Sequence, residues 1–164
     1  MPALVSRRAP HGPPLTSRWV RRVAERMLAS LDLEPAELSV HLSDDATLHE
    51  LNRTYRAKDR PTDVLAFELD PPSRVQHRPS PPTLLGDVVI SLDTAERQAR
   101  AHGHGLQHEV AHLLAHGLLH LFGYDHPTAS AQRLMDRKAR ELVALAVPAQ
   151  KSASKRQAGR AARR

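Results

Sequence analysis

The chain has 164 residues, of which 40% are apolar, 3% are aromatic and none is cysteine, and its formal net charge is +6. This length fits one domain with an appendage and excludes two domains of ordinary size, while the lack of cysteine excludes disulfides and thiolate metal ligands. Because the sequence contains no long apolar run and no signal-peptide pattern, we expect a soluble, cytoplasmic protein without a membrane partner.

The positive charge is concentrated near the C-terminus. Residues 151–164 hold six of the 24 basic residues and no acid, which leaves 18 basic against 18 acidic residues elsewhere. We therefore expect a near-neutral domain at residues 1–147 and a basic, disordered tail at residues 148–164. Such a tail also suits a weak tether to RNA or to the ribosome, so net charge alone does not establish RNA binding.

Hydrophobic periodicity and turn residues divide the first half of the chain into alternating strands and helices. In chain order, the predicted elements are a strand at 3–8, a helix that begins at Thr16 or Ser17, a strand at 38–42, a helix capped by Ser43 that runs to about Tyr55, a basic turn at 56–60 and a strand at 62–69. The inward face of the first helix is predicted to carry Trp19, Val20, Val23, Met27, Leu28 and Leu31.

The second half begins with a proline-rich stretch at 70–83, which predicts an exposed loop. The elements expected after it are a buried strand at 84–92 and helices at 93–102, 106–122 and 129–146, the last with Leu134, Met135, Leu142 and Val143 turned inward. This mixture predicts an α+β fold with a small mixed sheet of about four strands and about five helices packed on it.

Four histidines recur at every fourth position of the predicted helix at 106–122. Residues at i and i+4 lie about one turn apart on one helical face, but each such step advances roughly 40° around the axis, so four of them cannot reach one ion. Two overlapping zinc motifs result. One is His108-Glu109-x-x-His112, the pattern of many metalloproteases, and the other is His116-x3-His120-x5-His126.

The residues after His120 favour the second motif. Gly123 can adopt a positive φ and end the helix, so that His126 supplies a third ligand and the fourth position stays open. The first motif lacks the third ligand of the metzincin extension. We therefore predict zinc at His116, His120 and His126, in a cleft formed by the helix and the turn after it.

Gly117 stands where a protease of this spacing would carry its catalytic glutamate, so the predicted zinc site has no protease base. We expect His112 to be a half-buried neighbour of the zinc ligands and Glu109 to be an ordinary exposed acid of the helix.

Residues 116–126 read HGLLHLFGYDH and resemble the signature H-G-x-L-H-L-x-G-Y-D-H of the YbeY endoribonucleases, bacterial factors in ribosomal RNA maturation. Two further blocks agree in order and spacing. Residues 51–67 (LNRTYRAKDRPTDVLAF) resemble the family segment N-x-x-Y-R-x-x-D-x-P-T-D-V-L-S-F, and residues 85–91 (LGDVVIS) resemble its G-D-(I/V)-x-I-S strand. The likeness covers about residues 3–146.

The resemblance implies an α+β fold, one zinc ion and a basic cleft in which Arg56 assists catalysis. It also implies a single-strand-specific endoribonuclease that acts in 16S rRNA 3′ end processing, ribosome assembly and ribosome quality control. The expected partners are rRNA and the small ribosomal subunit with its assembly factors, and no DNA is expected.

The residues themselves support parts of this chemistry. A zinc ion can polarise a phosphoryl oxygen, and the planar fork of Arg56 fits two phosphate oxygens. We expect Arg53, Lys58 and Arg60 either to guide the RNA backbone or to form a solvated basic turn. Asp87 and Asp125 are candidates for supporting the zinc ligands. A general base is not identified, since Asp63 and Asp87 suit structural hydrogen-bond acceptors at strand ends equally well.

Two other functions compete with the nuclease. A metalloprotease would use His108, Glu109 and His112, and the missing third ligand argues against it. A non-enzymatic ribosome-assembly module held together by zinc is compatible with the same residues.

Overall fold

The computed structural model describes residues 3–7, 15–33, 35–70, 83–124 and 128–147. Its four strands are β1 (Ala3–Arg7), β2 (Ala36–Ser43), β3 (Val64–Glu68) and β4 (Thr83–Ser91), and its five helices are α1 (Ser17–Ser30), α2 (Asp45–Arg56), α4 (Leu92–His102), α5 (Leu106–Phe122) and α6 (Ala129–Ala146). The strands form one sheet in the order β1-β2-β4-β3, with β3 antiparallel to β4 and the other two pairings parallel. This mixed sheet with its helices confirms the predicted α+β fold.

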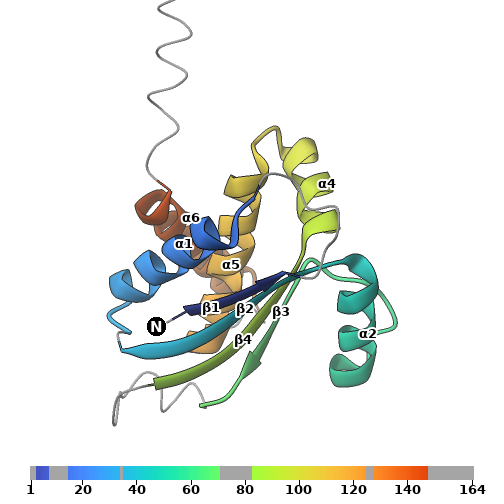
Figure 1. Cartoon of the computed structure of the whole chain (residues 1–164), viewed down its shortest axis with the longest axis horizontal. Coiled ribbons are helices and arrows are strands. Elements are labelled where there is room, and N and C mark those ends of the chain that lie inside the picture. Colours follow the sequence, from blue (N-terminus) through green and yellow to red (C-terminus); the bar gives the residue numbers. More distant parts are fainter. Residues whose placement is uncertain (1–2, 8–14, 34, 71–82, 125–127, 148–164) are drawn as a thin grey trace, which may run out of the picture.

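The two faces of the sheet are covered differently (Figure 1). Helices α1, α5 and α6 pack together on one face, where Val40, Val88 and Ile90 join the main core. Side chains alternate between faces along a strand, so Leu65 and Val89 point the other way and form a small second cluster with Leu48 of α2. The histidine-bearing helix therefore lies on the main-core side.

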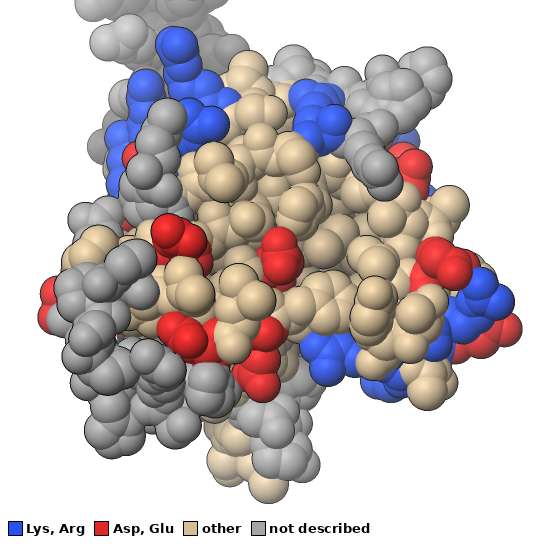
Figure 2. All heavy atoms as spheres, turned by 60° about the horizontal axis from the view of Figure 1, so that its bottom comes forward, with Lys and Arg blue, Asp and Glu red and all other residues tan. Residues whose placement is uncertain are grey.

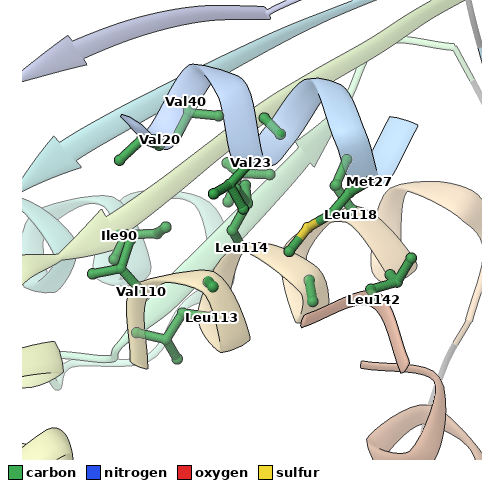
Figure 3. Packing of buried hydrophobic residues seen from close by; sticks show 14 of the residues in the cluster. Val20, Val23, Met27, Val40, Ile90, Val110, Leu113, Leu114, Leu118 and Leu142 are labelled. Atoms are coloured by element: carbon green, nitrogen blue, oxygen red, sulfur yellow. The ribbon is translucent and has the colours of Figure 1, made fainter. Parts of the chain in front are cut away.

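Aliphatic side chains build the main core, as the scarcity of aromatic residues requires. Figure 3 shows side chains of α1, α5, α6 and the sheet converging in it: Val20, Val23, Met27, Leu114, Leu118, Leu142, Val40 and Ile90. On the outside, acidic and basic side chains are interspersed over the face seen in Figure 2. The visible face therefore has no field of a single sign.

Several helices end where the sequence predicted, and two other predictions were wrong. Thr16 and Gly123 bound α1 and α5 as predicted. Ser43 does not cap α2, because it is the last residue of β2 and the carboxylate of Asp44 accepts the N–H of Thr47 at 2.9 Å instead. Leu134 of α6 is 39% exposed and does not turn inward, since the buried stripe of that helix runs through Met135.

The expected loop at 70–83 and the basic tail at 148–164 lie almost wholly outside the described residues. None of the helices within the described ranges is long and apolar enough to span a membrane.

Candidate metal centre and basic cavity

Helix α5 is buried on nearly all sides, because the sheet, α4 and α6 surround it. Leucine, alanine and valine lie around most of the circumference of this helix, and their apolar side chains allow it to be buried. Between Glu109 and Leu121, the only residues that are not fully buried are His112, His116 and His120. The i, i+4 spacing therefore places three imidazoles on a single half-open strip of an otherwise apolar helix.

Gly117 allows this strip to sit close to the sheet. A Cβ atom at this position would lie 2.6 Å from Cγ1 of Val88 on β4. Only glycine fits such an approach without displacing the strand. The absence of a glutamate at position 117, which argued against a protease, is therefore explained by packing: only glycine fits between α5 and β4.

The imidazoles of His112 and His116 face each other, with their Nε2 atoms 3.1 Å apart. Nε2 of His116 also lies 3.6 Å from the carboxylate of Asp136 on α6. Burial lowers the pKa of His112 below its ordinary value, and the neighbouring His116 lowers it further. His112 is therefore neutral at neutral pH, and the neutral imidazole is the form that binds metal ions.

The chain turns sharply after His120. Gly123 has a φ of 110° and ends α5 in the left-handed region, and the N–H of Tyr124 reaches back to the carbonyl of Leu119 at 2.9 Å. This is the hydrogen-bond pattern of a glycine-terminated helix. His126 and Asp125, the predicted third ligand and a predicted supporting acid, fall outside the described residues.

The described donors fit a zinc ion. His116 and His120 offer nitrogen ligands one turn apart, their strip opens to a cavity, and the turn at Gly123 redirects the chain immediately afterwards. Zinc prefers nitrogen ligands of this kind, with a fourth position open in catalytic sites.

A cavity of about 700 Å³ adjoins this strip and carries three cationic side chains. Arg56, Lys58 and Arg60 line it together with His120 and Tyr124. A second cavity of about 410 Å³ contains His112, His116 and His120. His120 borders both cavities, so the cavity of the histidine strip adjoins the cavity of the basic turn.

Arg56 is held in place without being neutralised. Its Nη2 donates to the backbone carbonyl of Ala66 at 2.6 Å, and its guanidinium carbon lies 5.3 Å from the ring centroid of Phe67. Among the described residues no carboxylate forms an ion pair with it. The remaining guanidinium N–H groups therefore keep their capacity to bind an anion.

The basic turn that follows Arg56 is fixed by Asn52. This side chain of α2 is buried and donates to the carbonyl of Arg60 at 2.9 Å. The backbone carbonyl of Asn52 accepts the N–H of Lys58 at 3.2 Å, while Ala57 adopts a left-handed φ of 54°. Asn52 was not among the predicted site residues. The sequence did contain a signal for its burial, because Asn52 is a polar residue on the same helical face as Leu48.

Two other predicted residues are engaged in local contacts, although Asp63 also lines the cavity of the histidine strip. Arg53 pairs with Glu50 at 2.5 Å and does not line either cavity described above. Asp63 accepts the N–H of Val64 at 2.8 Å and is also bonded by the Gln98 amide. It therefore acts as a structural acceptor at the start of β3.

Asp87 is on the opposite side of the sheet from the histidine strip. Its carboxylate lies 3.0 Å from Nε2 of His41, which in turn contacts Ser6. Because its neighbour Val88 points toward α5, strand alternation directs Asp87 away from that helix. Asp87 was expected to support the zinc ligands, but from this side of the sheet it does not reach the histidine strip.

Glu109 corrects a further prediction. It was expected to be exposed, but its side chain is only 2% exposed and its carboxylate is contacted by His104 and, at 3.5 Å, by His102. The helical pattern missed this because two glycines, Gly103 and Gly105, fold the preceding segment back over the first turn of α5. The two histidines beside these glycines were the available signal.

Together, the fold and the site define a class of α+β protein in which a half-open histidine strip on a buried helix meets a basic cavity. Comparison with known proteins gives the family. The family sequence model described as Endoribonuclease YbeY matches residues 12–146, and the chain belongs to this family.

Individual relatives agree. The chain is 47% identical over 123 residues to an endoribonuclease YbeY of Aquifex aeolicus, covering 75% of this chain and 76% of the relative. It is 45% identical over 129 residues to that of Pelotomaculum thermopropionicum, covering 79% and 84%. A solution structure from Thermotoga maritima shares the fold, with a TM-score of 0.62, 24% identity and 92% coverage of both chains.

Proposed function

We propose that this chain is a zinc-dependent endoribonuclease specific for single-stranded RNA. In our proposal it acts in the cytoplasm on rRNA, in the processing of the 16S 3′ end, in ribosome assembly and in ribosome quality control, with the small ribosomal subunit and its assembly factors as partners. The observation that carries the proposal is that His120 lines both the cavity of the histidine strip and the cavity that holds Arg56. Membership of a family described as endoribonucleases supports it.

The proposed roles follow from the chemistry of each side chain. His116, His120 and His126 hold the zinc, which when bound supplies a Lewis acid and lowers the pKa of water. Arg56 binds two oxygens of the scissile phosphate through its planar fork, because its guanidinium is anchored on Ala66 and forms no ion pair with a carboxylate in the described part of the chain. Lys58 and Arg60 attract the neighbouring phosphates.

A single strand suits this cavity better than a duplex. Its walls include apolar and aromatic surface beside the cations, notably Val64, Leu65 and Tyr124. Unpaired bases can stack on such surface, whereas the bases of a duplex are already stacked inside the helix.

The protease alternative is disfavoured by the position of Glu109. Its carboxylate is buried and already engaged by His104 and His102. His112 lines the cavity of the histidine strip while His108 does not. The pair required by the H-E-x-x-H motif is therefore not presented to one opening.

The test is a cleavage assay of the purified full-length protein on end-labelled single-stranded RNA, duplex RNA and single-stranded DNA. We expect cleavage of the single-stranded RNA alone, its loss with EDTA and its return with Zn²⁺, with metal content followed by mass spectrometry. His120→Ala, purified in parallel, controls for contaminating nucleases. Cleavage that persists after metal removal, or equal cleavage by His120→Ala, would contradict the proposal. A metal-bound protein that cleaves none of these would favour the assembly module.

A further inference from the structure

The connection between α4 and α5 gathers a second group of metal-ligating side chains. Helix α4 ends at His102, Gly103 adopts a left-handed φ of 70°, and α5 begins after Gly105. This tight reversal directs His102 and His104 onto Glu109 in the first turn of α5. One potential ligand atom from each of the three lies within 4.8 Å of the other two.

We propose that His102, His104 and Glu109 form a second site for a divalent transition-metal ion, separate from the zinc centre proposed at His116, His120 and His126. Two imidazoles and a carboxylate are a donor set that zinc uses, and imidazole also suits nickel, cobalt and copper. The chemistry selects a borderline-soft divalent ion over magnesium or calcium, which prefer oxygen ligands.

One of the three separations between ligand atoms already matches such an ion. Tetrahedral bonds of about 2.0–2.2 Å place neighbouring ligand atoms about 3.3–3.6 Å apart. Nδ1 of His102 lies 3.5 Å from Oε2 of Glu109, and Nε2 of His104 already contacts the same oxygen. Small side-chain rotations bring all three atoms to bonding distance of one ion.

The burial of Glu109 provides an independent reason. Its side chain is 2% exposed, and the polar groups that the structure places on its carboxylate are the two imidazoles. A buried carboxylate is costly unless its charge is compensated. A divalent ion held by the same three side chains supplies that compensation, and solvent reaches the site through His102, whose side chain is 59% exposed.

This second ion is structural rather than part of a two-metal catalytic centre. Glu109 and His116 are seven residues apart on α5, which corresponds to about 10 Å along the helix axis. Two-metal centres hold their ions about 3.5–4 Å apart. We therefore assign the second ion the role of fastening the α4–α5 reversal to the first turn of α5.

The test counts ions and reads their coordination with the full-length chain, loaded with Co²⁺ or Zn²⁺ after chelation and dialysis. The wild type should bind two ions, and the His116→Ala/His120→Ala variant should retain one, visible as the absorption of tetrahedral Co²⁺ and as a melting temperature that Zn²⁺ raises by a few degrees. Adding His104→Ala to this variant should lower its affinity for the remaining ion by at least about 100-fold. Even the loss of a residue that only supports a metal ligand lowers affinity about 10–100-fold.

His49→Ala is the matched control, because His49 also touches a carboxylate, Asp59 at 2.7 Å, but has no second histidine beside it. It should leave both ions in place. Glu109→Gln and His102→Ala repeat the test if His104→Ala fails to fold, which a melting curve reports. Retention of two ions by any of these three folded variants in the wild-type background, equal loss in His49→Ala, or loss of every ion in His116→Ala/His120→Ala would overturn the proposal. A wild type whose single ion survives in His116→Ala/His120→Ala would instead contradict the proposed zinc centre.

Discussion

Gly117 of α5 lies directly against Val88 of β4, so close that a Cβ atom on the glycine would be 2.6 Å from Cγ1 of the valine. Val88 is fully buried and branched at Cβ, so its methyl groups cannot swing aside freely. This contact sets the distance between the helix and the sheet. It thereby sets how His116, next to the glycine, meets the cavity.

The contact makes Gly117→Ala destabilising even though alanine is the better helix former. Alanine gains about 1 kcal/mol in helix propensity, but overpacking a tight core costs about 1–3 kcal/mol and locally separates helix and strand. We expect a net loss of up to about 2 kcal/mol in the free energy of unfolding, measured by urea denaturation. In a Val88→Ala background the same change should become neutral or stabilising. An unchanged penalty in that background would show that Val88 is not the obstacle.

Much of the fold followed from local sequence signals. Helix α5 ended where Gly123 allows a positive φ, and α6 began after Thr128, whose side chain accepts the N–H of Ala131 at 3.1 Å. Local signals could not reveal the sheet order, because pairing between β2 and β4 joins residues 47 or 48 positions apart. Neither the alternation of side chains nor the turn residues specify which strands become neighbours.

The site was predictable only where spacing along one helix determines it. The strip through His116 and His120 follows from the i, i+4 rule. Asp87 looked equally suitable in sequence, yet strand alternation and the position of α5 put it on the other face of the sheet. The burial of Glu109 depends on a chain reversal at Gly103 whose direction no periodicity reveals.

Asp45 links three elements and gives a prediction about acid stability. Its carboxylate accepts hydrogen bonds from Ser91 and Thr94, each at 2.6 Å, and pairs with Arg97 at 2.8 Å. Partial burial raises its pKa, but these three donors outweigh burial and hold the pKa below its ordinary value of 3.8. The stabilisation is therefore present above that value and is lost as pH falls through the lower pKa of the folded state.

We expect Asp45→Asn to cost about 2 kcal/mol of unfolding free energy at pH 7, since bonds to a charged acceptor are each worth about 1.5–3 kcal/mol and asparagine keeps part of them. The difference from wild type should shrink as pH falls from 5 toward 2. Urea denaturation of metal-free protein measures both. Asp59→Asn, at an acid whose side chain is 82% exposed, should change stability by no more than a few tenths of a kcal/mol. A penalty for Asp45→Asn that stays constant down to pH 2 would contradict the assignment.

The zinc ligands are tested by single substitutions. His116→Ala, His120→Ala and His126→Ala should each remove the zinc of the histidine strip and leave at most the ion at His102, His104 and Glu109, because three nitrogen ligands leave no spare donor. His108→Ala should keep the zinc of the strip, since His108 lies outside the cavity of the histidine strip. Metal analysis of the four proteins decides the matter. Zinc content that follows His108 would refute the ligand set.

Arg56 gives the sharpest test of the proposed activity. Its guanidinium is anchored by the carbonyl of Ala66 and by Phe67, and it lines the same cavity as His120. Because the side chain is exposed and leaves the core untouched, its replacement should affect turnover and not folding. Arg56→Glu should abolish cleavage of single-stranded RNA while zinc content and melting temperature stay at wild-type values.

Arg56→Lys should restore part of the activity, because an ammonium keeps the positive charge but loses the fork that binds two phosphate oxygens and the contact with the Phe67 ring. Arg100→Glu makes the same change of charge on α4, where the arginine is 78% exposed and pairs with Glu96, and should cleave at a near wild-type rate. Initial rates under conditions where EDTA stops the wild type compare the three variants. Undiminished cleavage by Arg56→Glu would remove this arginine from the mechanism, and an equal loss in Arg100→Glu would trace the effect to overall charge.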